Sequence, residues 1–243
     1  MKKTSLLFVP FVLAAALFFA SCGLDTVPIV PSPTVVIHEP VYTSTDYAAN
    51  YFEFVAPTVS SVPELTFLGT AVYYRIYASS STMLSRQSSI SAVNTESDSS
   101  AAASRMISYG YQQLNTSERE IQPLIDTNGG KIYIRLCNYG DGSNPANEYR
   151  ARIGVIDKIP RRAIGTNKTF DFGRYGKDKY GASENYTRPA SGDEDFESGT
   201  VSDNKYYVDM YAVCVGRDAT YTRHFSNVLH LGSVAIDAAA ENN

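Results

Sequence analysis

The feature that most constrains this fold is an alternation of apolar and polar residues with a period of two. Within residues 206–216, the side chains of Val208, Met210, Ala212 and Cys214 fall on one face. Successive side chains of a β-strand point to opposite faces, so this pattern predicts a half-buried strand. Similar β-rich or alternating segments predict further strands at residues 34–38, 51–56, 71–78, 131–139, 148–156 and 228–236.

Two stretches interrupt the alternation. Residues 79–128 begin with a run rich in Ser and Ala, and we predict an insertion there, mostly loop. Apolar residues at helical spacing between Ala103 and Leu114 predict one helix over residues 98–114. Residues 165–204 are rich in Gly, Tyr and charged residues and lack hydrophobic periodicity after Phe172, which predicts a long loop.

The last two predicted strands resemble a known family. Residues 206–213 read Tyr-x-Val-x-Met-x-Ala-Val, and Ser226 and Asn227 precede the strand at 228–236. This arrangement resembles the final strands of fibronectin type III and related immunoglobulin-like domains, although the family's core Trp is absent. The resemblance implies a mainly β domain over residues 34–236. It would be an immunoglobulin/fibronectin III-like sandwich with a helical insertion and long loops, followed by a tail at 237–243.

The N-terminus carries a second resemblance. Lys2 and Lys3 precede an apolar run at residues 6–18, as in a secretory signal, and residues 19–22 read Phe-Ala-Ser-Cys. This sequence resembles the lipobox of bacterial lipoproteins, with Phe in place of the usual Leu, a variation tolerated in spirochaetes. The resemblance implies a signal peptide at residues 1–21, acyl chains such as palmitate on Cys22, and a proline-rich tether at 22–33. It implies a lipid-anchored protein of the cell envelope, on the outer membrane, with the periplasmic or surface face left open.

Charge limits the possible partners. Residues 1–21 contain two lysines and no acid, so the predicted mature chain has 19 basic and 25 acidic side chains. This acidic balance argues against nucleic acid as a partner, because nucleic acid requires a basic surface. A membrane, through the lipid anchor, and a protein or glycan remain as expected partners.

The predicted loop at 165–204 is the candidate binding region. It carries side chains of the types that dominate the binding energy of protein interfaces. It also contains an acidic run at 193–197 that is similar to calcium ligands in residue type. A small basic patch near the strand at 148–156 is a further candidate, formed by Arg150, Arg152, Lys158, Arg161 and Arg162, but a solvated strand face is the favoured interpretation of these residues. The residues predicted to bind a partner are Arg174, Tyr175, Tyr180, Tyr186 and Arg188.

Catalytic and cofactor motifs are missing from the sequence. His38, His224 and His230 have no neighbours at metal-ligand spacing, and no phosphate-cradling or dinucleotide-binding motif occurs. We therefore expect no catalytic residue, no metal and no cofactor. Cys137 and Cys214 fall on different sides of their strands' apolar patterns, which favours free thiols over a disulfide without excluding one.

These observations favour a non-catalytic binding module for protein or glycan at the cell envelope. An alternative is a structural accessory subunit of a periplasmic envelope complex that docks through a sheet edge. A secreted hydrolase is the third possibility, because the residues of an active site can come from distant positions. The sequence does not identify the partner.

Overall fold

The computed structural model describes residues 29–59, 61–96, 98–116, 129–139, 151–154, 158–164, 172, 174–175, 188–201 and 204–237. These residues form a mainly β protein with two α-helices and a short 3-10 turn, η1 (Tyr47–Ala49). The predicted signal peptide at 1–21, Cys22 and residues 238–243 of the predicted tail lie outside the described residues, and Asp237, the first residue of that tail, ends the last strand instead.

Two larger sheets contain most of the strands. The smaller sheet has the order β1-β2-β6-β8, and the larger one has the order β11-β3-β12-β13, with β4 also paired to β3. The strands of the smaller sheet are β1 (Val35–His38), β2 (Phe52–Ala56), β6 (Gly130–Arg135) and β8 (Arg152–Ile153). Those of the larger sheet are β3 (Thr66–Tyr77), β4 (Gln112–Gln113), β11 (Phe196–Glu197), β12 (Lys205–Arg217) and β13 (Arg223–Asp237).

Two further strand pairs are short. β5 (Asn115–Thr116) pairs antiparallel with β9 (Pro160–Arg161), and β7 (Asn138–Tyr139) pairs parallel with β10 (Arg174–Tyr175). Three of the strands in the larger sheet are long, and β12 pairs antiparallel with both β3 and β13 over nearly its whole length. The alternation at 206–216, 71–78 and 228–236 therefore predicted the three main strands correctly, and the structure extends each of them.

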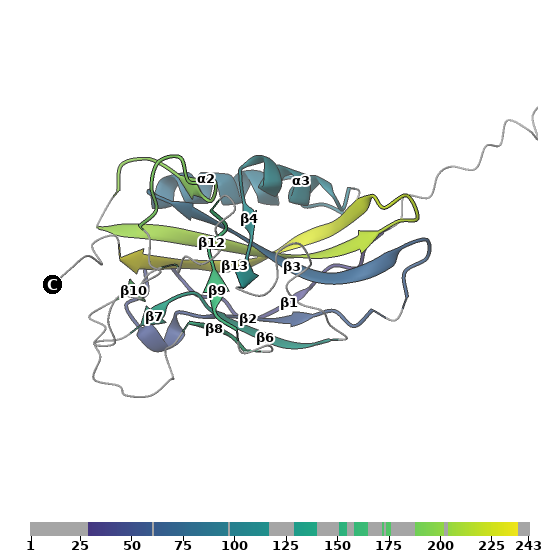
Figure 1. Cartoon of the computed structure of the whole chain (residues 1–243), viewed down its shortest axis with the longest axis horizontal. Coiled ribbons are helices and arrows are strands. Elements are labelled where there is room, and N and C mark those ends of the chain that lie inside the picture. The colour runs from purple at the N-terminus through teal and green to yellow at the C-terminus, as the bar shows by residue number, and fades with distance from the viewer. Residues whose placement is uncertain are drawn as a thin grey trace, which may run out of the picture.

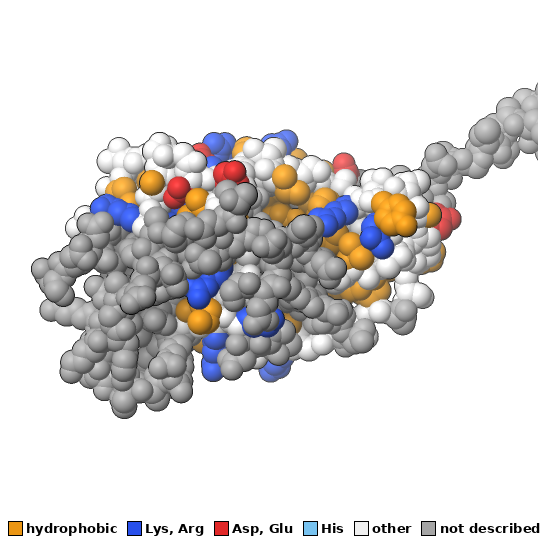
Figure 2. Space-filling model, viewed as in Figure 1, with side chains coloured by type: hydrophobic (Ala, Val, Ile, Leu, Met, Phe, Trp, Pro, Cys, Tyr) orange, Lys and Arg blue, Asp and Glu red, His pale blue; other side chains and the backbone are white. Residues whose placement is uncertain are grey.

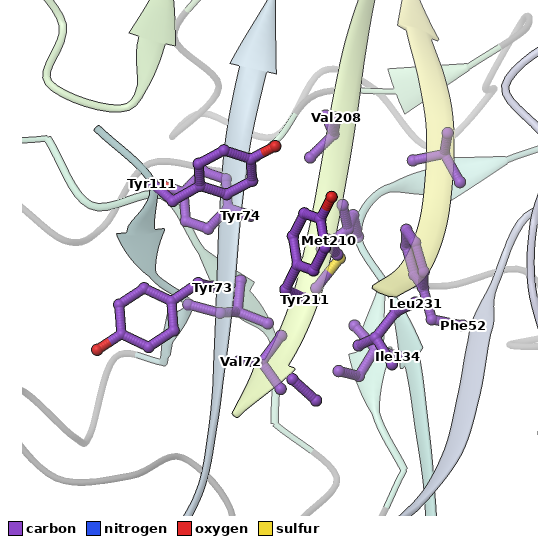
Figure 3. Packing of buried hydrophobic residues seen from close by; sticks show 14 of the residues in the cluster. Phe52, Val72, Tyr73, Tyr74, Tyr111, Ile134, Val208, Met210, Tyr211 and Leu231 are labelled. Atoms are coloured by element: carbon purple, nitrogen blue, oxygen red, sulfur yellow. The ribbon is translucent and has the colours of Figure 1, made fainter. Parts of the chain in front are cut away.

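The larger sheet is the central layer of the molecule. The smaller sheet lies on one face of it, and the helices α2 (Ser80–Ser91) and α3 (Ala101–Ser108) cover the other face (Figure 1). Side chains from both sheets form one hydrophobic cluster, in which Met210 and Leu231 of the larger sheet approach Phe52 and Ile134 of the smaller one (Figure 3). The core therefore lies between the two sheets, with a second buried layer under the helices.

The helical layer corrects two predictions. β12 is buried on both faces from Tyr206 to Val215, not half-buried, because the helices cover the face that carries Tyr207 and Tyr211. The Ser-rich residues expected to be mostly loop form α2, whose Met83 and Ile90 lie two turns apart and are fully buried.

The helix predicted over residues 98–114 is shorter than expected. α3 ends at Ser108, and the chain continues through Gly110 into β4 and β5. Gly110 has a φ of +80°, a left-handed conformation that favours glycine and ends a helix. Leu114 is buried beside β3, where its N–H donates to the carbonyl oxygen of Val72 at 2.7 Å.

Cys137 and Cys214 are both buried, and they form no disulfide. Cys214 Sγ lies 3.5 Å from Thr70 Oγ1, and burial raises the pKa of the Cys214 thiol to about 11.

Among the described residues, no helix is long and apolar enough to cross a membrane.

Candidate functional site

The structure describes only part of the predicted binding region. Arg174 and Tyr175 form β10, beside β7, and Arg188 begins the described segment 188–201. Tyr180 and Tyr186 lie outside the described residues. The described segments on either side of this region show how its two ends are attached.

Arg188 packs on the larger sheet. Its Nε–H donates a hydrogen bond to the hydroxyl of Tyr206 at 2.9 Å, and its guanidinium carbon lies 5.8 Å from the centroid of that ring. Tyr206 is buried at the start of β12 and meets Phe196 edge-on, with 5.4 Å between the ring centroids. Arg188 therefore helps to hold the returning chain against the sheet.

A buried ion pair connects the two ends of the region. Arg162 and Asp195 are both fully buried, although they are 33 residues apart in the sequence. Arg162 Nε donates to Asp195 Oδ2 at 2.9 Å, and Arg162 Nη2 donates to Asp195 Oδ1 at 2.7 Å. This two-point geometry is the strong, directional form of arginine–carboxylate pairing. It joins the chain just before residue 165 to the chain just after residue 187.

Two further side chains complete the pairing. The Tyr74 hydroxyl donates to Asp195 Oδ2 at 2.7 Å and accepts a hydrogen bond from the N–H of Ala163. Arg162 Nη2 also donates to Asp193 Oδ2 at 2.9 Å. We call Tyr74, Arg162, Asp193 and Asp195 the clamp, because together they tie both ends of residues 165–187 to β3.

The electrostatics keep the clamp charged. Burial alone lowers the pKa of Arg162, but the hydrogen bond and the negative charge of Asp195 outweigh this effect and raise it. The pKa of Tyr74 is raised well above its ordinary value by burial and by the adjacent Asp195 carboxylate. Arg162 is therefore a cation and Tyr74 a neutral hydrogen-bond donor at neutral pH.

Backbone bonds reinforce the same junction. The N–H of Ile76 donates to the Asp195 carbonyl at 2.9 Å, and the N–H of Ala78 donates to the Glu197 carbonyl at 3.2 Å. These bonds make β11 a short parallel strand on the edge of β3. Phe172, from inside the predicted loop, also packs edge-on against Tyr74, with 4.7 Å between the ring centroids.

The clamp corrects one expectation about charge. Arg162 was placed with an exposed basic patch and is instead the largest fully buried side chain among the described residues. Most carboxylates of the acidic run at 193–197 pair with arginine. Asp193 and Asp195 pair with Arg162, and Glu197 accepts a hydrogen bond from Arg86 at 2.8 Å. In the described part of the chain, no group of three His, Cys, Asp or Glu residues is arranged to hold a metal ion.

A second buried carboxylate lies on the other face of the larger sheet. Asp209 accepts hydrogen bonds from Gln87 Nε2 at 2.7 Å and from the Tyr111 hydroxyl. Its Oδ1 also lies 2.8 Å from His230 Nε2, and the other ring nitrogen of His230 lies 3.2 Å from Glu39 Oε1. Burial lowers the pKa of His230, but Asp209 and Glu39 raise it more, so the net shift is upward.

Sequence reasoning missed both buried carboxylates. Asp209 stands inside the apolar run Tyr-Tyr-Val-Asp-Met-Tyr, and an acid in such a run is a signal of a buried, partnered charge. For Asp195 and Arg162 no such local signal exists, because each stands directly beside a residue of like charge, Glu194 and Arg161, as surface residues often do.

Searches against protein-family models, curated proteins and solved structures found no match to this chain.

Proposed function

We propose that this chain is a lipid-anchored protein of the cell envelope whose β domain presents residues 165–187 to a protein or glycan partner. The clamp is the observation that carries the proposal. A buried, bidentate ion pair fixes both ends of this segment to β3. Binding residues are commonly found on connecting segments that a rigid scaffold positions, and the clamp provides such a scaffold.

The composition of the segment supports a binding role. It contains Arg174, Tyr175, Tyr180 and Tyr186, whose side chain types dominate the energy of many interfaces. Tyrosine provides a large contact area and a hydroxyl with few rotatable bonds, which limits the entropy lost on binding. The function proposed here is non-catalytic and requires no cofactor.

We further propose that the two larger sheets form a sandwich of the immunoglobulin/fibronectin III kind. The order β3-β12-β13 matches strands C, F and G of that fold, and β1-β2 occupy the places of A and B. One feature departs from it. In the immunoglobulin order A-B-E-D, strand E lies next to strand B and comes after strand D in the sequence. Here β6 lies next to β2 but comes before β8 in the sequence.

The proposed anchor is Cys22. Two or three acyl chains on this residue attach a domain far more firmly than one myristoyl chain, which gives only marginal binding. The first test is metabolic labelling with a palmitate analogue, which we expect to label the wild type and not the Cys22→Ser variant. Equal labelling of both proteins would refute the anchor.

An accessory role in an envelope complex is the second candidate. β1 is the outer strand of the smaller sheet, and its Val35 and Ile37 side chains are exposed. An exposed apolar edge strand is suited to pairing with another protein. In that case the partner would contact β1 and not residues 165–187.

Photo-crosslinking in intact cells separates the two candidates. A photoreactive phenylalanine analogue is placed at Tyr180 or Tyr186, at Val35 in β1, and at exposed Leu84 in α2 as the control. We expect a discrete adduct from Tyr180 or Tyr186 that Leu84 does not give and that Arg162→Leu weakens. An adduct from Val35 alone would support the accessory role and refute the proposed binding segment.

A further inference from the structure

The N-terminal end of the domain docks at one end of the larger sheet. Val30 is buried, and its side chain and that of Leu65 pack over Gly216, where an added Cβ would lie 3.2 Å from each of them. Gly216 lies near the end of β12, next to the connection between β12 and β13. The chain therefore leaves the domain beside this hairpin.

The hairpin tip projects an aromatic side chain into solvent. Tyr221 is 76% exposed and has a φ of +67°, a left-handed conformation that is uncommon for a bulky residue. Asp218 holds this conformation: its carboxylate accepts from the N–H groups of Thr220 and Thr222, and its carbonyl accepts from the N–H of Tyr221. The exposed ring is thus displayed by an ordered turn.

A basic side chain lies beside this ring, and an exposed apolar one belongs to the segment that docks at the same end of the sheet. The guanidinium carbon of Arg217 lies 4.9 Å from the centroid of the Tyr221 ring, and Ile29, directly before the buried Val30, is 69% exposed. We call Ile29, Arg217 and Tyr221 the tether-end surface. Figure 2 shows hydrophobic and basic side chains close together at the end of the molecule that carries the β12–β13 connection in Figure 1.

We propose that the tether-end surface contacts the phospholipid interface of the membrane that holds the acyl chains. This inference rests on the lipidation of Cys22 proposed above. Ile29 lies seven positions after Cys22, and a fully extended chain spans at most about 3.6 Å per residue, or about 25 Å in all. The tether therefore cannot carry this end of the domain far from the lipid headgroups.

The chemistry of the surface fits that location. Tyrosine is enriched where a membrane meets water, because its ring is apolar and its hydroxyl is polar. Arg217 is placed to bond lipid phosphate, and Ile29 adds an exposed apolar side chain. The acid of the tip, Asp218, is engaged within the turn: its Oδ1 accepts from the N–H groups of Thr220 and Thr222, and its Oδ2 lies 2.8 Å from His224 Nε2.

The proposed contact would orient the domain. Thr66 at the start of β3 pairs with Arg217, whereas Tyr77 at its end pairs with Tyr207. The clamp, on the second half of β3, is thus displaced from the tether-end surface along the strand. β10, which bears Arg174 and Tyr175, lies toward the opposite end of the molecule (Figure 1). A membrane contact at Tyr221 would direct the proposed binding segment away from the bilayer.

Tryptophan fluorescence tests this orientation, because the chain contains no Trp. The full acylated lipoprotein is reconstituted into phosphatidylcholine–phosphatidylglycerol vesicles that contain a brominated phospholipid. Tyr221→Trp and Ile29→Trp report on the tether-end surface. The control is Leu84→Trp, at an exposed position on α2 soon after the distal end of β3. Urea unfolding midpoints confirm that each variant is folded.

We expect bromine to quench the Tyr221→Trp variant several-fold more than the Leu84→Trp variant, with its emission shifted to shorter wavelength on reconstitution. Equal quenching of these two variants, in protein that floats with the vesicles, would overturn the membrane contact and leave the anchor intact. Quenching of the Ile29→Trp variant alone would also overturn the membrane contact, because only the end of the tether would then be near the bilayer. Loss of flotation would overturn both proposals.

Discussion

Two fully buried carboxylates lie on opposite faces of the larger sheet, and they are neutralised in different ways. Asp195 pairs with Arg162 through two short hydrogen bonds. Asp209 receives hydrogen bonds from the neutral donors Gln87 and Tyr111 and faces His230, whose second ring nitrogen contacts the half-exposed Glu39. One carboxylate therefore has a permanent cation, and the other has a cation that titrates.

The two faces of the sheet therefore differ in how their charges respond to pH. Arginine stays protonated throughout the pH range of proteins, so the cation of the clamp does not titrate. Histidine changes charge near neutral pH, so the cation that faces Asp209 does titrate. The junction at the two ends of residues 165–187 is thus the one with the permanent cation.

The largest effect is expected from Arg162→Leu, which leaves Asp195 buried without its cation. Removing one partner of a buried ion pair typically costs about 3–5 kcal/mol. We expect the free energy of unfolding, measured by urea titration, to fall by an amount in that range. Lys131→Ala, which removes an exposed cation from β6, is the control. A loss as small as that of the control would show that the clamp is not needed for stability.

A smaller effect is expected from Asp209→Asn. The amide keeps the shape of the carboxylate but points an NH₂ group at donors, so at least one buried hydrogen bond is lost. An unsatisfied buried polar group costs about 1–3 kcal/mol. Urea unfolding measures the change, and Glu64→Gln, at an exposed position, is the control. A variant as stable as the wild type would show that the Asp209 carboxylate does not contribute to the stability of the fold.

The smallest effect is expected from the titration of His230. Its pKa is raised in the folded state, so its charged form stabilises the protein fully below the unfolded pKa of about 6.5. This contribution disappears as the pH rises through the folded pKa. The groups facing the ring are Asp209, Glu39 and Tyr211, the last with 4.9 Å between the ring centroids.

Urea unfolding at a series of pH values, in the wild type and in His230→Gln, measures this contribution. We expect the wild type to lose stability relative to the variant as the pH rises above about 6.5 and through the raised pKa of folded His230. Parallel curves for the two proteins would show that His230 does not carry the pH dependence.

Much of the β structure could be predicted from the alternation of residues. The strands at β3, β12 and β13 follow from it directly, because a period of two is a local property of the chain. The candidate site was only partly predictable. The segment around Arg174 and Tyr175 was proposed from its composition and stays a prediction. Its clamp was not predicted, because Arg162 and Asp195 come together only when β11 lies beside β3.

The sequence by itself determined where the chain forms its main strands and which residues on them are apolar. Only the tertiary structure decided that β12 is buried on both faces, since the Ser-rich helix α2 and α3 cover the second face. It also decided that the charged side chain of Arg162 is buried and that the Asp209 carboxylate receives hydrogen bonds. Burial and charge pairing depend on segments far apart in the sequence, and no local pattern records which of them will meet.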